Sequence, residues 1–176
     1  MHAYRMQQLI KERRKDDVVN VSQRNSVYQT IQRLVRDGLA EVVSTERAAN
    51  RPERTTFRIT ERGQVTLHDW LVAMLSAPAS EYAEFPAALS FLPNLAPAEA
   101  LAALSTRVVH LEEQLVDLDA EVAHVESFLP ALFAVESAYR RKVVEAELGY
   151  VRGLVAELRS GQMNWPFVDG RPVWPG

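Results

Sequence analysis

A heptad pattern of leucine and valine in the C-terminal half of this 176-residue chain limits the folds open to it. The pattern extends over about four heptads, as a coiled coil requires, and Pro130 ends it. A further helix is expected over residues 131–159, closed by Gly161. We therefore predict an antiparallel or coiled-coil helical dimerisation domain. Its seam consists of Leu101, Leu104, Val108, Leu111, Leu115, Leu118, Val122 and Val125, and Leu129 continues the spacing.

The N-terminal part predicts a different arrangement. A helix is expected over residues 3–15. A second helix is expected to begin at Ser22, whose hydroxyl can cap it, and to end at Gly38, where glycine tolerates positive φ. Within that second helix, Val27, Ile31, Leu34 and Val35 recur at helical spacing. This pattern gives the second helix one buried face and leaves polar residues on the other.

Two strands, residues 39–45 and 55–60, flank a polar loop and predict a hairpin, and a helix follows over residues 61–76. This order is that of a winged helix-turn-helix, whose second helix enters the major groove of DNA. The predicted fold is mainly α with a small β-hairpin. Its parts are a winged helix-turn-helix DNA-binding domain (1–76), a proline-rich connection with a short helix (77–97), the helical dimerisation domain (98–160) and an irregular tail (161–176).

Charge differs between the two ends of the chain. Residues 1–62 hold thirteen Lys/Arg and eight Asp/Glu, a net +5, whereas residues 63–176 hold seven and fifteen, a net −8. A basic module joined to an acidic one fits contact with a polyanion through the first module alone. Chance variation in surface charge is the alternative.

The candidate DNA contacts lie at the start of the second helix and in the hairpin loop. Asn25 and Gln29 are four residues apart on one helical face, and side-chain amides can pair with adenine. Ser26 and Tyr28 can donate to phosphate. The whole predicted set is Arg24, Asn25, Ser26, Tyr28, Gln29, Arg33, Arg47, Arg51 and Arg54. The alternative is a solvated helix tip and an ordinary charged loop.

Several stretches together resemble the PadR-like transcriptional regulators: MHAYRMQQLI, NSVYQTIQRLVRDGLAEVV, RPERTTFRITERG and LHDWL. The resemblance covers residues 1–76 and extends more loosely to about residue 165, in the manner of the subfamily with a long virulence-activator-type C-terminal helical domain. It implies a homodimeric repressor that leaves DNA when a small molecule or another signal arrives. It also implies that Tyr28 holds a DNA phosphate, flanked by Ser26, Gln29 and the wing arginines.

Two departures from the family pattern stand out. Phe57 replaces the usual tyrosine of the wing. Family members also have another helix before the segment that matches MHAYRM, and its apolar face closes the winged-helix core. A misassigned start, a truncation and a different segment in that place are the three explanations open at this point.

An effector pocket, if the chain has one, is expected between the two modules, because aromatic side chains with a polar handle line many small-molecule sites. Core packing of a dimer is the alternative for each residue. The predicted set is Trp70, Met74, Tyr82, Phe85 and Phe91.

Other functional classes find little support. The chain has no cysteine, its four histidines are scattered, and it contains neither a P-loop nor a GxGxxG motif, so we expect no enzyme, metal or cofactor. No apolar run approaches the roughly 20 residues that cross a bilayer, and we expect a cytoplasmic protein. The expected partners are a pseudo-palindromic double-stranded operator and a second copy of the chain. The alternative is a winged-helix module for protein–protein contacts without specific DNA binding.

Overall fold

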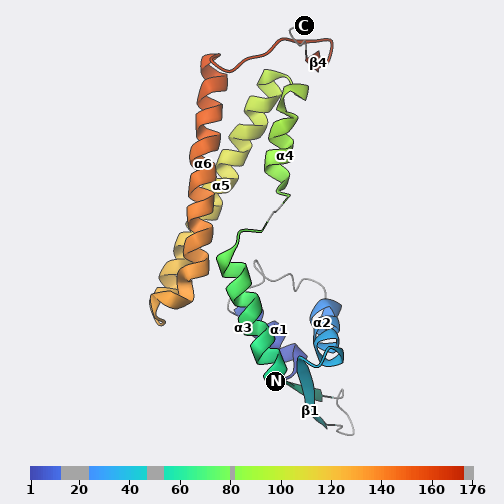
Figure 1. Cartoon of the computed structure of the whole chain (residues 1–176). Coiled ribbons are helices and arrows are strands. Elements are labelled where there is room, and N and C mark those ends of the chain that lie inside the picture. The colour runs from blue at the N-terminus through green and yellow to red at the C-terminus, as the bar shows by residue number, and fades with distance from the viewer. Residues whose placement is uncertain (13–23, 47–53, 80–81, 173–176) are drawn as a thin grey trace. The chain divides into compact units, whose positions relative to one another are not determined.

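A computed structural model describes residues 1–12, 24–46, 54–79 and 82–172 (Figure 1). The chain divides into two compact units, Met1–Glu81 and Tyr82–Gly176. The predicted fold class is confirmed: helices predominate, with a small β-hairpin in the first unit.

The first unit has the expected order of elements. They are α1 (Ala3–Glu12), α2 (Arg24–Arg36), β1 (Ala40–Glu46), β2 (Arg54–Ile59) and α3 (Glu61–Ser76). The two strands pair antiparallel, from Ala40 opposite Ile59 to Glu46 opposite Arg54. The predicted cap Ser22, the end of the first predicted helix and the centre of the hairpin loop lie outside the described residues.

Helix α2 ends where the sequence predicts it. Gly38 adopts φ +72°, and its backbone N–H donates to the Val35 carbonyl at 3.1 Å. The N–H of Leu39 donates to the Leu34 carbonyl at 2.8 Å. Two of the carbonyls at the end of the helix are thereby satisfied as the chain turns into β1.

The first residues of the chain lie along the outer edge of β2. The ammonium group of Met1 donates to the Phe57 carbonyl at 2.7 Å, and the Phe57 N–H donates to the Met1 carbonyl at 3.0 Å. A bridge between His2 and Thr56 continues this pairing. The hairpin thus gains a short third strand segment.

The second unit is built on a long helical hairpin. Its elements are α4 (Glu84–Ser90), the 3-10 turn η1 (Leu92–Asn94), α5 (Pro97–Glu126), the 3-10 turn η2 (Ala131–Ala134), α6 (Val135–Ser160), β3 (Phe167–Val168) and β4 (Arg171–Pro172). Helices α5 and α6 run side by side in opposite directions (Figure 1).

The α5 seam is packed within one chain. Leu104, Leu111 and Leu118 are buried, the latter two being 6% and 3% exposed, and they form one cluster with α6. The α6 side of this cluster consists of Val144, Leu148, Val151, Leu154 and Val155. The other predicted seam positions, Leu101, Val108, Leu115, Val122 and Val125, are half-buried. Leu129 lies beyond the end of α5, because the helix stops at Glu126.

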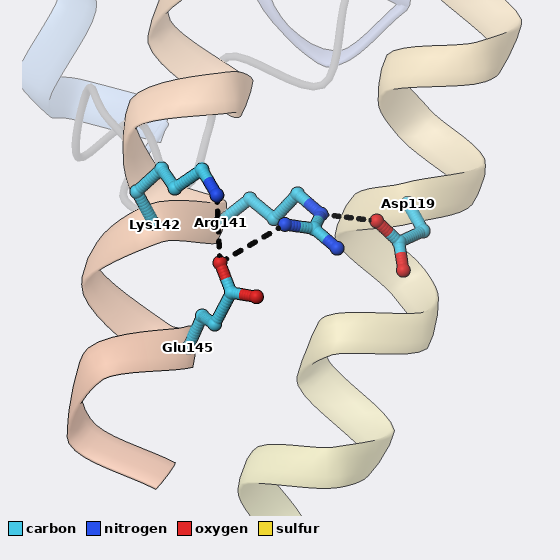
Figure 2. Close-up of polar contacts among 4 residues, drawn as sticks. All are labelled: Asp119, Arg141, Lys142 and Glu145. Carbon is cyan, nitrogen blue, oxygen red and sulfur yellow. Dashed lines mark hydrogen bonds and ion pairs between the residues drawn. The ribbon is translucent and has the colours of Figure 1, made fainter. Parts of the chain in front are cut away.

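Ion pairs on both flanks of the hairpin connect its two helices. Arg107 Nη2 lies 2.5 Å from Glu147 Oε1 on one flank, and Arg152 Nη2 lies 2.6 Å from Glu112 Oε1 on the other. Nearer the turn, Arg141 reaches across to Asp119 (Figure 2).

The carboxylate of Glu145 lies one turn further along α6 and takes part in the same cluster. It accepts from Lys142 Nζ at 2.9 Å and from Arg141 Nη1 at 3.2 Å (Figure 2). The hydrogen bond from Lys142 is the main cause that lowers the pKa of Glu145 below its ordinary value.

The tail was expected to be irregular, but it contains the short antiparallel pair β3–β4. The turn between these strands is Asp169-Gly170, with φ of +48° and +74°. An Asp-Gly pair with positive φ at both positions is typical of a tight hairpin turn, so the signal was present in the sequence. The tail is also held at Trp165, whose indole N–H donates to the Leu95 carbonyl at 3.0 Å.

Gly63 should be intolerant of a side chain. A Cβ at this position would collide with the Leu39 carbonyl, whereas a Cβ at Gly149 in α6 would meet nothing within 4 Å. We expect Gly63→Ala to lower the free energy of unfolding by about 1–3 kcal/mol through overpacking. Gly149→Ala should raise it by about 0.5–1 kcal/mol, because glycine is costly inside a helix. Urea unfolding followed by circular dichroism measures both, and equal stability of the two variants would contradict the close approach.

Candidate nucleic-acid interface

Helix α2 has one face in the protein and one face in solvent. Ile31 is buried, and Val27 and Leu34 are half-buried. Gln29 is exposed on the opposite side, and Tyr28, 49% exposed, lies at the edge of the buried face. These polar side chains make no hydrogen bond or ion pair to any residue that the structure describes, and neither does the exposed Arg33. The outward face is therefore available to a partner.

The other predicted DNA contacts can be placed only in part. Arg24, Asn25 and Ser26 form the first turn of α2, and Arg54 begins β2, but their side chains lie outside the described residues. Arg47 and Arg51 lie wholly outside them. What the structure brings together from the predicted set is Tyr28, Gln29 and Arg33, on one helix.

Two arginines near this face are already paired. Arg36 Nε donates to Asp37 Oδ1 at 2.8 Å, and this hydrogen bond is the main cause that lowers the pKa of Asp37. Across the hairpin, Arg58 Nη2 lies 2.6 Å from Glu41 Oε1. Each ion pair removes one charge of either sign, so the net +5 of residues 1–62 is unchanged, but Arg36 and Arg58 are less free than Arg33 to meet a phosphate.

An apolar groove of about 310 Å³ lies in the first unit, between helices α2 and α3 and the hairpin. Helix α2 contributes Ile31 and Leu34, and α3 contributes Leu67 and Trp70. The remaining wall consists of Met6, Leu39, Ala40, Phe57, Arg58, Ile59, Gly63 and Thr66. Helix α3 also exposes large apolar side chains that do not line the groove, Val65, Leu71 and Met74, and the lining residues Leu67 and Trp70 are exposed as well.

The five residues of the predicted effector pocket fall in both units. Trp70 and Met74 are exposed on α3, and Tyr82 and Phe91 are exposed in the second unit. Phe85 is half-buried, and the Arg107 guanidinium lies 3.7 Å above its ring centroid. Phe85 therefore anchors α4 to the helical hairpin, and the pocket stays a prediction.

A second apolar face lies on α6 and was not assigned a role from the sequence. Five apolar residues recur there in steps of three and four, and all five are exposed: Val135, Tyr139, Val143, Ala146 and Tyr150. The exposed Leu132 and Phe133 of η2 extend this surface at the turn of the hairpin. We call Val135, Tyr139, Val143, Ala146 and Tyr150 the α6 stripe. Its spacing was visible in the sequence, but only the structure shows that it points away from α5.

Within the described parts of the chain, no group of three or more His, Asp or Glu side chains could hold a metal ion. Across the same residues, none of the helices is long and apolar enough to cross a membrane.

Comparison with known proteins agrees with this geometry. Residues 1–69 match the family model described as "Transcriptional regulator PadR-like family". Bacillus subtilis PadR, crystallised in complex with operator DNA, has the same fold, with a TM-score of 0.70 and 18% sequence identity over 90% of this chain and 91% of that one. The same protein in complex with p-coumaric acid gives 0.67 and 16%, over 90% of each chain.

Protein smu.1604c from Streptococcus mutans UA159 is also similar, with a TM-score of 0.53 and 17% identity over 73% of this chain and 76% of that one. None of the curated proteins matches the sequence. The winged helix-turn-helix of the first unit agrees with this match: over residues 1–69 the chain is similar to the PadR-like transcriptional regulators, and its fold is that of B. subtilis PadR.

Proposed function

We propose that this protein is a homodimeric repressor that binds a double-stranded, pseudo-palindromic operator through α2 and the β1–β2 wing. The observation that carries the proposal is the outward face of α2. Gln29 and Arg33 are exposed there, opposite the buried Ile31, and Tyr28 is exposed at the flank; none of the three has a partner among the described residues. Operator DNA bound to B. subtilis PadR, which shares the fold, supports it.

The roles proposed along α2 follow from side-chain chemistry. The N-terminal part of a recognition helix reaches the base edges, and a side-chain amide can pair with adenine in two hydrogen bonds. Gln29, with Asn25 one turn before it, is therefore proposed to read bases. The Tyr28 hydroxyl is proposed to donate to a phosphate, and Ser26 and Arg33 to lie beside it. Arg24 is proposed to pair with guanine or with a phosphate.

The wing is proposed to supply electrostatic affinity without sequence choice. Arg47, Arg51 and Arg54 stand in or beside the hairpin loop, where they can meet the DNA backbone or the minor groove. Arg58 is proposed to contribute less, because Glu41 already neutralises it.

A mobility-shift assay with the region upstream of the protein's own gene, at two salt concentrations, tests the function as a whole. A specific DNA-binding protein should prefer this duplex to a scrambled one, and log affinity should fall with log salt at about −0.9 per phosphate neutralised. A second candidate function, protein–protein contact, is favoured by the apolar groove and the exposed apolar side chains of α3. Absence of a shift at both salt concentrations would support that second function.

Gln29→Ala and Tyr28→Phe should differ in what they weaken. We expect Gln29→Ala to lower operator affinity by about 1–3 kcal/mol and to leave binding to scrambled DNA nearly unchanged, because a base contact is lost. Tyr28→Phe should weaken both by about 0.5–1.5 kcal/mol, the contribution of one neutral hydrogen bond. Gln64→Ala, an exposed glutamine on α3, is the matched control. If Gln29→Ala weakens both duplexes equally, α2 positions the protein and another element reads the sequence.

Two copies of the chain are proposed to associate through the helical hairpin. Leu104, Leu111 and Leu118 are buried by α6 within one chain, so they cannot also pack against a second copy without the hairpin opening. The α6 stripe remains exposed, and its spacing suits helix-to-helix packing. We therefore propose that the stripe forms the dimer contact, in place of the α5 seam. We also propose that the second unit corresponds to the long, virulence-activator-type C-terminal helical domain of the PadR subfamily named above.

Tyr139→Glu combined with Val143→Glu should give monomers in sedimentation velocity, because charge on the stripe opposes its burial. Val109→Glu combined with Val116→Glu is the matched control. These α5 valines are 50% and 67% exposed, comparable to the stripe residues, and they belong to neither the stripe nor the seam. If the dimer persists in the Tyr139/Val143 variant but is lost in the Val109/Val116 variant, the contact lies on the outer face of α5 and not on the stripe. Leu111→Asp would not discriminate, because it breaks the core of a single chain.

Release from DNA is proposed to follow binding of a small molecule, since B. subtilis PadR has been crystallised with p-coumaric acid. Trp70 belongs to the predicted effector set and is 53% exposed, so its fluorescence can report occupancy. In a Trp165→Phe, Trp174→Phe background, p-coumaric acid should change Trp70 emission with a saturable curve. The same background carrying Trp70→Phe is the control for inner-filter effects. A linear response identical in both proteins would count against a phenolic acid at this site, and a cationic aromatic compound would be titrated next.

A further inference from the structure

The end of α2 and the start of α3 meet at one residue, Thr60. Its hydroxyl donates to the Gly38 carbonyl at 2.8 Å and accepts from the Gly63 N–H at 3.0 Å. Its backbone N–H donates to the Leu39 carbonyl at 3.1 Å. We call Gly38, Leu39, Thr60 and Gly63 the Thr60 joint.

The joint is also sterically tight. Gly63 is buried, and a Cβ there would overlap the carbonyl of Leu39, so α3 can approach the exit of α2 this closely only with glycine at that position. Thr60 itself holds an extended conformation, with φ −83° and ψ 167°, before the helix begins. The Thr60 carbonyl accepts from the Gln64 N–H at 2.9 Å, so every hydrogen-bonding group of this residue is engaged.

Thr60 makes more hydrogen bonds than an N-cap residue needs. Threonine is a common N-cap because its oxygen accepts from a backbone N–H in the first turn, and the bond from Gly63 alone satisfies that role. The two bonds from Thr60 to the carbonyls of Gly38 and Leu39 are additional, and both cross from one element to another. They tie the residues that directly follow α2 to the residue that directly precedes α3.

This connection matters because of what each helix carries. Helix α2 bears the residues proposed to touch DNA, and α3 is the last element of the first unit before the chain continues into the second. We propose that Thr60 and Gly63 are positioning residues that make α2 and α3 move as one body, so that a displacement of α3 reaches the DNA-reading face. This inference rests on the proposed function. It adds a route by which a movement of α3, the element that leads into the second unit, would change DNA binding by α2.

Thr60→Asp removes the hydroxyl bond to Gly38 while keeping the cap bond from Gly63. Aspartate is a good N-cap and can still accept from the Gly63 N–H, but an ionised carboxylate cannot donate to the Gly38 carbonyl. Thr60→Ser keeps both functions. The upstream region of the protein's own gene and a scrambled duplex of the same composition are the DNA probes, used with the full-length protein.

We expect Thr60→Asp to reduce the ratio of upstream-region to scrambled affinity by about tenfold, the effect of losing about one well-placed hydrogen bond. Thr60→Ser should stay within about twofold of the unmodified protein. The ratio is the informative quantity, because partial unfolding or the added negative charge lowers both affinities together. Amide hydrogen exchange adds a measurement without DNA: the Leu39 N–H should exchange about tenfold faster in Thr60→Asp and not in Thr60→Ser.

The outcomes separate the two ideas. If the unmodified protein binds both duplexes equally, the proposed function is wrong. Amide exchange at Leu39 in Thr60→Asp and Thr60→Ser then tests the Thr60 joint independently of DNA binding. A Thr60→Asp protein that keeps the ratio, or keeps slow exchange at Leu39, overturns the joint. If Thr60→Asp melts below the assay temperature, Thr60→Ala is measured by the same affinity ratio and the same amide exchange, because it removes the hydroxyl bond to the Gly38 carbonyl, together with the cap bond from Gly63, without adding a charge.

Discussion

Burial of one side of α5 against α6 is the interaction on which the second unit depends. Leu104, Leu111 and Leu118 lose nearly all contact with water there, and each such side chain contributes about 1.5–3 kcal/mol. The flanking pairs Arg107–Glu147 and Arg152–Glu112 add little energy at the surface, but they favour one register of the two helices. Because this seam is used within one chain, the dimer contact proposed above falls on the α6 stripe, which is exposed.

The first unit is held together differently. Among its described residues, the buried side chains are few, Ile31 and Phe57 being the apolar ones. Much of its order comes from backbone geometry instead: the Gly38 cap, the pairing of Met1 with Phe57 and the hydrogen bonds of Thr60. A domain with so small a core gains from any partner that covers its apolar groove.

Electrostatics in the first unit depend on which arginines remain unpaired. Arg36 and Arg58 are held by Asp37 and Glu41, whereas Arg33 is exposed and has no such partner among the described residues. A count of charges along the chain cannot make this distinction. The polar face of α2 is therefore better evidence for DNA contact than the net charge of the segment, because it names side chains that are available.

The sequence alone determined the order of elements and the C-terminal ends of α2 and α3, because caps, glycines and apolar periodicity act over a few neighbouring residues. Its motifs also indicated the PadR-like resemblance that the match over residues 1–69 bears out. It also placed Gln29 opposite Ile31, since 3.6 residues per turn fix the faces of a helix. It missed the β3–β4 turn, although Asp169-Gly170 signalled it. Only tertiary structure decided which apolar stripe is buried. The α5 seam and the α6 stripe have similar spacing, and periodicity cannot say whether a helix meets its own chain or another one.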